Sequence, residues 1–561
     1  MSGSDNESQK SARRDVLKGI TAGSVVALAG CSDLDSGNGD SATDSGDGSG
    51  TGGSGGQVVK FELMTASQSA RPLLHEAQKL TANEFRNVGI EVSLNGLSVQ
   101  KTVEKAVRKG DYDVLGISFS DSISRLIDPD TLLSQLLGKG QLNISRYENK
   151  EFLDTLNESR KTYDRNERQE LIYETQRIAH QDLPLVVHNT RDVLIPLRTD
   201  RFSDPVVMPG VGVDSVQNHV NIKPKSGVSR LRVLKPGRAV DNLNPLLGIQ
   251  GELVTYRNFY DTLLLIDPET LGPKPWAAED WNTVDDTTIE LTLRDGLTFH
   301  DGKSLTAEDV KFTFEYMAKN SPAYKPRTQA IESVEMDGET DLRFNLKAPD
   351  APFVNLSLTQ VPLLPKHIWS DLSEVPTDFQ NEEPIGSGPF KVDYWRPQEE
   401  LGLTAYDDHF ATPRVDSLSY IPTSDTQTAV RYIESGDGDT FAIQSSVPPT
   451  SIDRVKNLES TRLIQSPGHG PFALFFNLKR KPMNDKAFRQ AAARLVPRKD
   501  ILKTVFRDYG TVENDSVITK PIEFWHNSNL PKRQFDPEKA RQILIDAGYT
   551  YDDQDRLHYP G

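Results

Sequence analysis

The sequence predicts an α/β protein built of several lobes, and three observations lead to this fold class. The chain has 561 residues, and at about 100 to 200 residues per domain this length suggests roughly three domains. Segments with strand-like alternation repeatedly follow segments with helical spacing. The composition, 36% hydrophobic and 26% charged residues, is typical of a soluble globular protein.

The first lobe is expected to begin with alternating strands and helices. Residues 59–63 alternate apolar and polar side chains, which is the period of a half-buried strand. Residues 73–85 carry apolar side chains at helical spacing, and Gly89 stands where a C-terminal cap belongs. The further elements expected here are a strand at 90–94, a helix at 99–108 that ends at Gly110, and a strand at 112–117.

The following part is expected to contain two helices and a pair of strands. Helical spacing recurs around residues 152–156 and 171–179. The apolar run 183–197 predicts two paired strands near a turn at Asn189. Residues 223–227, Lys-Pro-Lys-Ser-Gly, indicate a boundary.

The second half predicts a hairpin and two capped helices. Residues 289–299 alternate apolar and polar side chains around an Asp-Gly turn, which is typical of a hairpin. Thr306 with Asp309 three positions later forms a capping box at the start of a helix. A late helix is expected at 537–547, opened by an Asp-Pro pair and ended by Gly548.

The start of the chain has the pattern of an export address followed by an anchor. Arg13 and Arg14 precede a short, weakly apolar stretch at 20–28, which resembles a twin-arginine export signal. Residues 28–31, Leu-Ala-Gly-Cys, look like a lipobox, in which the sulfur of Cys31 takes a diacylglyceryl group. The alternative is that Cys31 is a small buried apolar residue.

Residues 32–56 are expected to form a disordered tether. They contain glycine, serine and aspartate and almost nothing apolar, so nothing offsets the entropy of ordering them. Cys31 is the only cysteine, which excludes disulfides, thiolate zinc sites and cysteine nucleophiles in the mature chain. The motifs G-x-S-x-G, H-E-x-x-H and the P-loop are missing too. We therefore expect neither an enzyme nor a cofactor or metal.

The formal net charge of −17 narrows the classes of partner. Like charge repels at the range where encounter is steered, so nucleic acids and anionic membrane surfaces are disfavoured. Basic and neutral ligands remain compatible with this net charge. An acidic excess spread over the chain also fits a protein kept soluble in high salt.

A long motif carries a resemblance to a known family. The motif comprises residues 278–281 and 291–310 (LTLRDGLTFHDGKSLTAEDV), with further matches at 386–391 and 476–491. With these residues the chain resembles the family 5 extracellular solute-binding proteins, which carry peptides, nickel and related solutes. The resemblance implies a periplasmic-binding-protein-like type II fold, with two large α/β lobes plus an extra subdomain, connected by a hinge.

The order of the parts departs from the family. Segments like 230–561 come first in the family and segments like 58–220 come last, whereas here they are reversed. We therefore expect a circular permutation that makes Gly561 and Gln57 neighbours in space and joins the old termini through residues 223–227. The alternative is a fusion of two incomplete genes. The expected parts are a signal with lipobox at 1–31, the tether at 32–56, the second part of the C-terminal-type lobe at 57–190, a return strand into the N-terminal-type lobe at 191–225, the N-terminal-type lobe with an inserted subdomain at 226–474, and the first part of the C-terminal-type lobe at 475–561.

The resemblance also implies ligand-binding residues. Peptide binders of the family hold the ligand as an extra strand and neutralise its amino terminus with an acid, which Asp121 matches here. The family usually has a tryptophan shortly before this acid, whereas Phe119 stands here, so the pocket wall and its specificity differ. Tyr260, Asn244 and Phe472 belong to segments that approach the cleft in the family, and each is also a candidate for core packing.

Two further residues are expected to serve the fold. His300 lies in a turn that recurs in members with different ligands, which favours a structural role over metal binding. Arg489 suits a structural ion pair.

The function that these expectations support is ligand capture for transport. The resemblance implies a monomeric substrate-binding lipoprotein that captures a peptide or peptide-like solute and delivers it to an ABC permease with its ATPase. Its place would be the extracellular face of the cell membrane. The alternatives are a sensory or scaffold lipoprotein that uses the same cleft, a binder of a nickel chelate or a sugar, and a degenerate protein that binds nothing.

Overall fold

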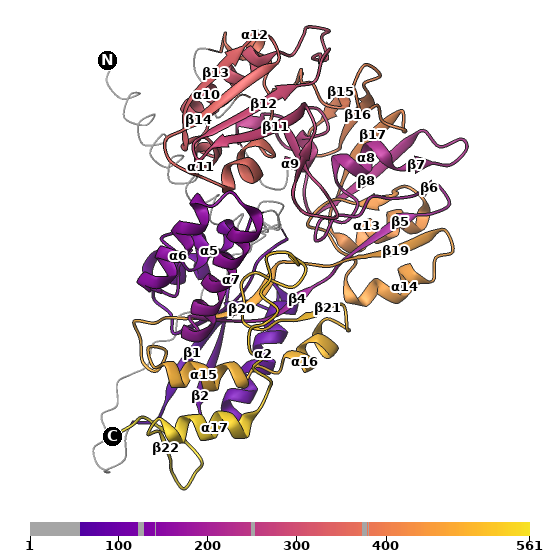
Figure 1. Cartoon of the computed structure of the whole chain (residues 1–561). Coiled ribbons are helices and arrows are strands. Elements are labelled where there is room, and N and C mark those ends of the chain that lie inside the picture. Colours follow the sequence, from indigo (N-terminus) through magenta and orange to yellow (C-terminus); the bar gives the residue numbers. More distant parts are fainter. Residues whose placement is uncertain (1–56, 122–127, 141, 248–252, 373–378, 380) are drawn as a thin grey trace, which may run out of the picture.

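The computed structural model describes residues 57–121, 128–140, 142–247, 253–372, 379 and 381–561 (Figure 1). The export signal with Arg13 and Arg14, the lipobox with Cys31 and the tether lie outside the described residues. The fold is the α/β class that the sequence predicts. No helix among the described residues combines the length and the apolar character that a membrane span requires.

A six-stranded sheet forms the lower part of the molecule in Figure 1. Its strands pair in the order β2-β1-β3-β20-β4-β21; β1 is parallel to β2 and β3, whereas β20 is antiparallel to β3 and β4. The strands are β1 (Lys60–Ala66), β2 (Glu91–Leu97), β3 (Val114–Ser118), β4 (Leu185–Arg191), β20 (Pro471–Phe476) and β21 (Gly510–Val512). Together with the helices that pack on it, this sheet is here called the six-stranded unit.

Helices cover both faces of this sheet. Along β20, Phe472, Leu474 and Phe476 point into one hydrophobic core, and Ala473 and Phe475 point into the other. One core is closed by α2 (Pro72–Asn87), α15 (Lys486–Arg494) and α17 (Pro537–Asp546), and the other by α5 (Asp130–Leu136), α6 (Lys150–Lys161) and α7 (Arg165–Asp182). A strand buried on both faces reads as a continuous apolar run.

Helices α2 and α17 end at the glycines that the sequence indicates, whereas α5 and α15 were not predicted and α6 and α7 extend beyond the predicted 152–156 and 171–179. Gly89 follows α2 with a φ of +81°, a left-handed conformation that glycine adopts without a Cβ penalty. Asp536 caps α17 by accepting a hydrogen bond from the backbone N–H of Lys539, and Gly548 follows with positive φ. The segment predicted as a helix at 99–108 is helical as α3 (Val99–Thr102) and a π-helical stretch, Val103–Lys109.

A seven-stranded sheet and its attachments form the rest, here called the seven-stranded unit. The strand order is β15-β16-β17-β8-β18-β5-β19. The strands are β5 (Val193–Arg198), β8 (Arg230–Pro236), β15 (Phe390–Arg396), β16 (Glu400–Ala405), β17 (Ser417–Thr423), β18 (Thr440–Phe441) and β19 (Thr461–Ser466). Its helices and short pairs are α8 (Val216–Asn221), α9 (Leu253–Tyr256), α13 (Thr426–Ser435), α14 (Ile452–Lys456), β6 (Phe202–Ser203) with β7 (Lys223–Pro224), and β9 (Leu264–Ile266) with β10 (Pro273–Pro275).

A four-stranded antiparallel sheet extends this unit at the top of Figure 1. Its strands, in the order β11-β12-β14-β13, are β11 (Ala278–Asp285), β12 (Thr288–Leu293), β14 (Asp341–Leu346) and β13 (Ile331–Asp337). Helix α10 (Ala307–Asn320) packs on it through Val310, Phe314 and Met317 and begins with the predicted capping box. The short helices α11 (Lys325–Thr328) and α12 (Lys366–Trp369) complete this layer.

Two chain segments cross between the units. Strand β4 in the six-stranded sheet continues at Asp192 directly into β5 of the seven-stranded sheet, and β19 leads through residues 467–470 into β20. The predicted hairpin with a turn at Asn189 is therefore wrong, because Asn189 lies inside β4 and the two strands belong to different sheets. Nearly every residue of this run is buried, so no alternation marks where the sheets change.

The hairpin predicted at 289–299 is also wrong, because its first strand pairs with strands other than the predicted one. Strand β12 pairs with β11 and β14, whereas residues 297–299 contribute only an isolated bridge between Thr298 and Ser304. The local alternation of β12 indicated a strand correctly but contained no information about which strand would lie beside it.

The first and last described segments are hydrogen-bonded neighbours. The backbone N–H of Val59 donates to the carbonyl of Leu557 at 2.7 Å, and that of Tyr559 donates to the carbonyl of Gln57 at 3.0 Å. Strands β22 (Thr550–Tyr551) and β23 (Leu557–His558) form the turn that leads to this contact.

Candidate functional site

A polar cavity lies where the two units meet, beside both crossing segments. Its volume is about 150 Å³. The six-stranded unit contributes the end of β3, the end of β4, the start of β20 and the residue before α2, and the seven-stranded unit contributes loops that follow β8 and β18. The lining residues are Arg71, Ser118, Phe119, Ser120, Asp121, Arg191, Val193, Arg238, Gln444, Ser445, Ser446, Gly470 and Phe472.

Asp121 lies at this cavity, three residues beyond the end of β3. Its Oδ1 accepts hydrogen bonds from the backbone N–H groups of His469 at 2.6 Å and Gly470 at 2.8 Å, so the crossing segment holds the carboxylate in place. The side chain keeps 16% of its surface exposed. Asp121 thus lies just beyond a strand end, at the boundary of the two units.

Two glycines make this arrangement sterically possible. A Cβ on Gly468 would lie 1.9 Å from the carbonyl oxygen of Arg191, and a Cβ on Gly470 would lie 2.2 Å from that of Phe119. Backbone atoms cannot yield at such distances without a shift of the chain. The crossing segment therefore needs glycine at both positions to approach Asp121.

Phe119 and Phe472 form the aromatic part of the wall. Both are almost buried, and they pack against Phe475 at 6.0 Å and Phe506 at 4.8 Å between ring centroids. Each ring belongs to a hydrophobic core with one side and to the cavity with the other.

Tyr260 and Asn244 do not line the cavity. Both are fully buried in the seven-stranded unit. The hydroxyl of Tyr260 accepts a hydrogen bond from Asn381, and burial raises the pKa of this phenol. Asn244 accepts from the backbone N–H of Leu246 and donates to the carbonyl of Phe379. The contacts of these two residues serve the packing of their own loops.

Sequence reasoning missed three guanidinium groups, those of Arg71, Arg191 and Arg238. They come from segments far apart in the chain, so no spacing relates them. One local signal was available: Arg191 and Asp192 interrupt the apolar run 183–197, at the position where β4 leaves its sheet. Burial lowers the pKa of Arg191, and the nearby carboxylates of Asp121 and Asp192 oppose that effect.

The two residues expected to serve the fold do so. His300 bonds through Nε2 to the carbonyl of Gly388 at 2.9 Å and through Nδ1 with the backbone N–H of Gly386, and burial lowers its pKa to about 4. Arg489 donates to backbone carbonyls, including those of Asp182 and Met483, in place of the expected ion pair. Within the described part of the chain, no cluster of three or more His, Cys, Asp and Glu side chains is arranged to hold a metal ion.

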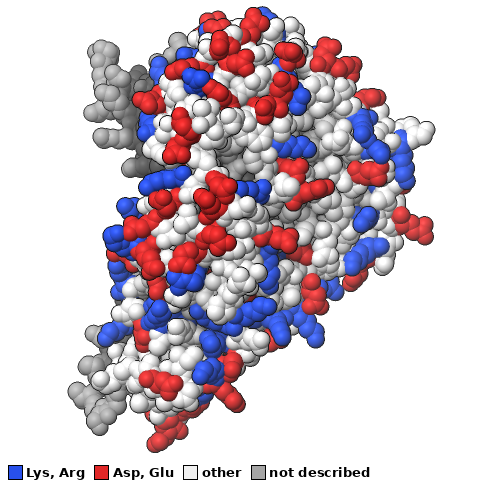
Figure 2. Space-filling model, in the orientation of Figure 1, with Lys and Arg blue, Asp and Glu red and all other residues white. Residues whose placement is uncertain are grey.

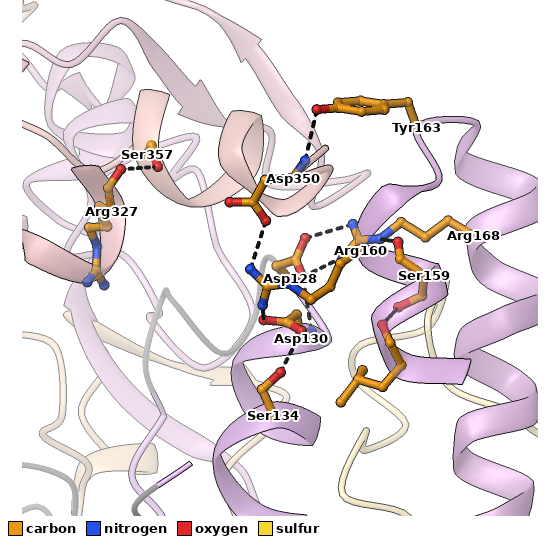
Figure 3. A network of polar contacts seen from close by, with 11 residues as sticks. Asp128, Asp130, Ser134, Ser159, Arg160, Tyr163, Arg168, Arg327, Asp350 and Ser357 are labelled. Carbon is orange, nitrogen blue, oxygen red and sulfur yellow. Dashed lines mark hydrogen bonds and ion pairs between the residues drawn. The ribbon is translucent and has the colours of Figure 1, made fainter. Parts of the chain in front are cut away.

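A second polar contact joins the two units away from the cavity, and Figure 3 shows it. Arg168 of α7 donates two hydrogen bonds to Asp128, at 2.9 and 2.8 Å, and both side chains are buried. Arg160 of α6 bridges Asp130 at 2.6 Å and Asp350 of the seven-stranded unit at 2.8 Å. We call these five side chains the Asp128 network.

The Asp128 network continues into the seven-stranded unit through neutral groups. Asn355 donates to Asp128 at 3.1 Å. The backbone N–H of Asp350 donates to the hydroxyl of Tyr163 at 3.1 Å (Figure 3). The network thus fastens the helices of one unit to a loop of the other.

Two sheets joined by two crossing segments, with a polar cavity beside them, define the architecture of a two-lobed binding protein. The family model described as "Bacterial extracellular solute-binding proteins, family 5 Middle" matches residues 272–559. The chain therefore belongs to family 5 of the bacterial extracellular solute-binding proteins. Members of this family bind solutes, in agreement with the expectation that the protein is not an enzyme.

Individual relatives agree with this assignment. The chain is 28% identical to the oligopeptide-binding protein AppA of Bacillus subtilis over 54% of this chain and 57% of AppA. It is 27% identical to the dipeptide-binding protein of Escherichia coli over 55% of this chain and 61% of that protein. The matches thus span about three fifths of each relative.

A solved structure shows the same fold. The oligopeptide-binding protein of an oligopeptide ABC transporter from Thermotoga maritima superposes with a TM-score of 0.50 at 23% identity. The superposition covers 59% of this chain and 64% of that chain.

Proposed function

We propose that this protein is the substrate-binding component of an ABC importer, which captures a peptide or peptide-like solute between its two units and delivers it to the permease. The observation that carries the proposal is the cavity at the crossing segments, because both units supply its walls. A ligand held by both walls favours the closed arrangement, and the permease with its ATPase would read that arrangement.

Asp121 and the two phenylalanines provide the contacts for a short peptide. The backbone amides occupy Oδ1 of Asp121, and Oδ2 is the oxygen that we assign to a ligand ammonium group. Phe119 and Phe472 offer apolar surface on either side. Relatives named for oligopeptides and dipeptides support a ligand of this class.

The proposal includes export and anchoring. Arg13, Arg14 and the apolar stretch after them would direct the folded protein through the twin-arginine route, and Cys31 would take the lipid. The segment 32–56 would then tether the binding protein at the extracellular face of the cell membrane. Mass spectrometry of the protein from membranes tests this: a diacylglyceryl adduct on Cys31 is expected, and a chain that still carries residues 1–30 contradicts it.

We further propose that the chain is a circular permutation of its family. The hydrogen bonds between residues 57–59 and 557–559 support this, because a family-like chain would run from β23 into β1 at that point. The turn that leads from β7 into β8 would join the old ends at 223–227. The division into lobes at 57–190, 191–225, 226–474 and 475–561 is part of this proposal.

A rearranged chain tests the permutation. Linking Gly561 to Gln57 and opening the chain at residues 225–227 restores the family order while keeping the described contacts. We expect a monomer with one cooperative unfolding transition and unchanged ligand binding. Two independent transitions, or obligate pairing of two copies, favour the gene-fusion alternative.

A thermal-shift screen tests ligand capture. Short peptides, nickel chelates and sugars are added separately, and a ligand at one hundred times its Kd stabilises the folded state by about 2.7 kcal/mol. A shift with peptides alone supports the proposal. A shift with nickel chelates or sugars alone contradicts the peptide assignment, and the lack of any shift contradicts ligand capture.

A further inference from the structure

The cavity between the units has the opposite charge balance to the protein around it. The whole chain has a net charge of −17, and Figure 2 shows acidic and basic side chains interspersed over one face. The cavity is lined by three guanidinium groups, Arg71, Arg191 and Arg238, and one carboxylate, Asp121. A ligand in the cavity therefore meets a local excess of positive charge, and local charge decides binding at contact distance more than net charge does.

The two carboxylates near Arg191 are already engaged. Asp121 receives two backbone N–H groups on Oδ1. Asp192, the next residue in the chain, accepts a hydrogen bond from the side chain of Gln465 at 2.5 Å. Neither carboxylate forms an ion pair with Arg191 among the described residues.

The guanidinium of Arg191 has no direct partner among the described residues. Its half-buried side chain lines the cavity, and within the described part of the chain no hydrogen bond or ion pair involves it. The other partly buried arginines at the boundary behave differently: Arg160 bridges two aspartates, and Arg238 donates to Gln444 and Ile443. The carboxylates of Asp121 and Asp192 attract this guanidinium without direct contact among the described residues, so its hydrogen-bond donors are left for a ligand that can supply acceptors.

The backbone of Arg191 is held firmly. Arg191 pairs with Gly510 of β21 in the sheet. The backbone N–H of the next residue, Asp192, donates to the carbonyl of Tyr509 at 3.3 Å. Gly468 approaches its carbonyl from the other side. The base of the side chain is therefore fixed, and the planar guanidinium suits bidentate contact with a carboxylate.

We propose that Arg191 is a specificity-determining residue that binds an anionic group of the ligand, so that the cavity prefers short peptides with an acidic side chain. This inference rests on the proposed function, since it names the ligand class for the same cavity. Asp121 receives the ligand's ammonium group and Arg191 its side-chain carboxylate. The cavity volume of about 150 Å³ is smaller than that of most ligand sites, so we test the shortest peptides, dipeptides.

Three dipeptides of similar size test the inference by isothermal titration: Ala-Glu, Ala-Gln and Ala-Lys. We expect Ala-Glu to bind about tenfold or more tightly than Ala-Gln, and Ala-Lys to bind most weakly, because a hydrogen bond between two charged groups is stronger than one to a neutral amide. In Arg191→Gln, the preference for Ala-Glu over Ala-Gln is expected to fall to about one, while Ala-Gln keeps its affinity.

Arg480→Gln is the matched control. Arg480 also belongs to the six-stranded unit, but it pairs with Asp111 and Asp113 outside the cavity, so its loss should leave the preference unchanged. Equal affinity of the wild type for Ala-Glu and Ala-Gln, or a preference that survives Arg191→Gln, overturns the inference and leaves the proposed function intact. If none of the three dipeptides binds, the peptide function itself fails, and the inference falls with it.

Discussion

The two polar contacts between the units differ in how their charges are matched. In the Asp128 network, both arginines have carboxylate partners, and Asp128 also accepts from Asn355. At the cavity, Arg191 forms no hydrogen bond or ion pair within the described residues, and Oδ1 of Asp121 accepts from two backbone amides, with Nδ1 of His469 at 3.3 Å. Matched charges at a boundary hold the fold, whereas an unmatched charge marks a place for a ligand.

Asp128→Ala is expected to lower the free energy of unfolding by about 3–5 kcal/mol, because it leaves the buried guanidinium of Arg168 without its bidentate partner. Urea unfolding measures the loss. Asp154→Ala is the control, since Asp154 pairs with Lys150 on the exposed side of α6 and should change stability by less than about 1 kcal/mol. A loss of that small size for Asp128→Ala would show that the network is not what fastens the units.

Glu513 is expected to make the free energy of unfolding depend on pH. Burial raises its pKa to about 7, with Lys520 opposing the shift, and its oxygens accept long hydrogen bonds from Lys520 and Thr190. The folded state then binds a proton that the unfolded state releases, so this contribution is full below about pH 4.5 and is lost as the pH rises towards 7. The loss is up to about 3 kcal/mol.

Unfolding of the wild type and of Glu513→Gln at pH 5 and pH 8 checks this sign. The wild type should lose more stability between these values than the variant does. Parallel changes in both proteins would assign the pH dependence to other groups.

Gly470→Ala should cost about 2 kcal/mol or more, because the added Cβ would lie 2.2 Å from the carbonyl oxygen of Phe119. The displaced crossing segment would also release Asp121, so affinity for any ligand should fall. Gly272→Ala is the control, since its Cβ would meet only side-chain atoms, the end of the flexible Arg165 at 3.3 Å and the hydroxyl of Thr270 at 3.5 Å. Equal unfolding midpoints for the two variants would refute the steric argument.

Arg191→Gln should have the smallest effect on the ligand-free protein. Removal of a half-buried charge without a partner is expected to leave the free energy of unfolding unchanged or to raise it by up to about 1 kcal/mol. The same variant loses the selectivity for acidic dipeptides. A destabilisation as large as that of Asp128→Ala would place Arg191 among the matched structural charges and remove the contrast between the two contacts.

Much of the secondary structure could be predicted, because its signals are local. Helices α10 and α17 begin at the caps that the sequence indicates, and α2 and α17 end at the indicated glycines. Both hairpins failed for one reason: the partner of a strand is set by the sheet, and neither the run 183–197 nor the alternation of β12 contains that information.

The residues of the candidate site were likewise predicted only in part. Asp121, Phe119 and Phe472 were named from the family motif, and the structure brings them to one cavity. Tyr260 and Asn244 were named on the same grounds, but they lie in the packed core. A family segment can approach a cleft while a given side chain on it points inward, and only packing decides which way it points.

Local signals in the sequence indicated the α/β class, the ends of α2 and α17 and the family, because caps, periodicity and a long motif act over a few residues at a time. The tertiary structure alone decided that Arg71, Asp121, Arg191, Arg238 and Gly470 surround one cavity. They meet because two segments cross between the sheets at the same place, and the pairing of distant strands fixes that place. Whether a charge is matched or left for a ligand follows from that arrangement, and no local pattern in the chain encodes it.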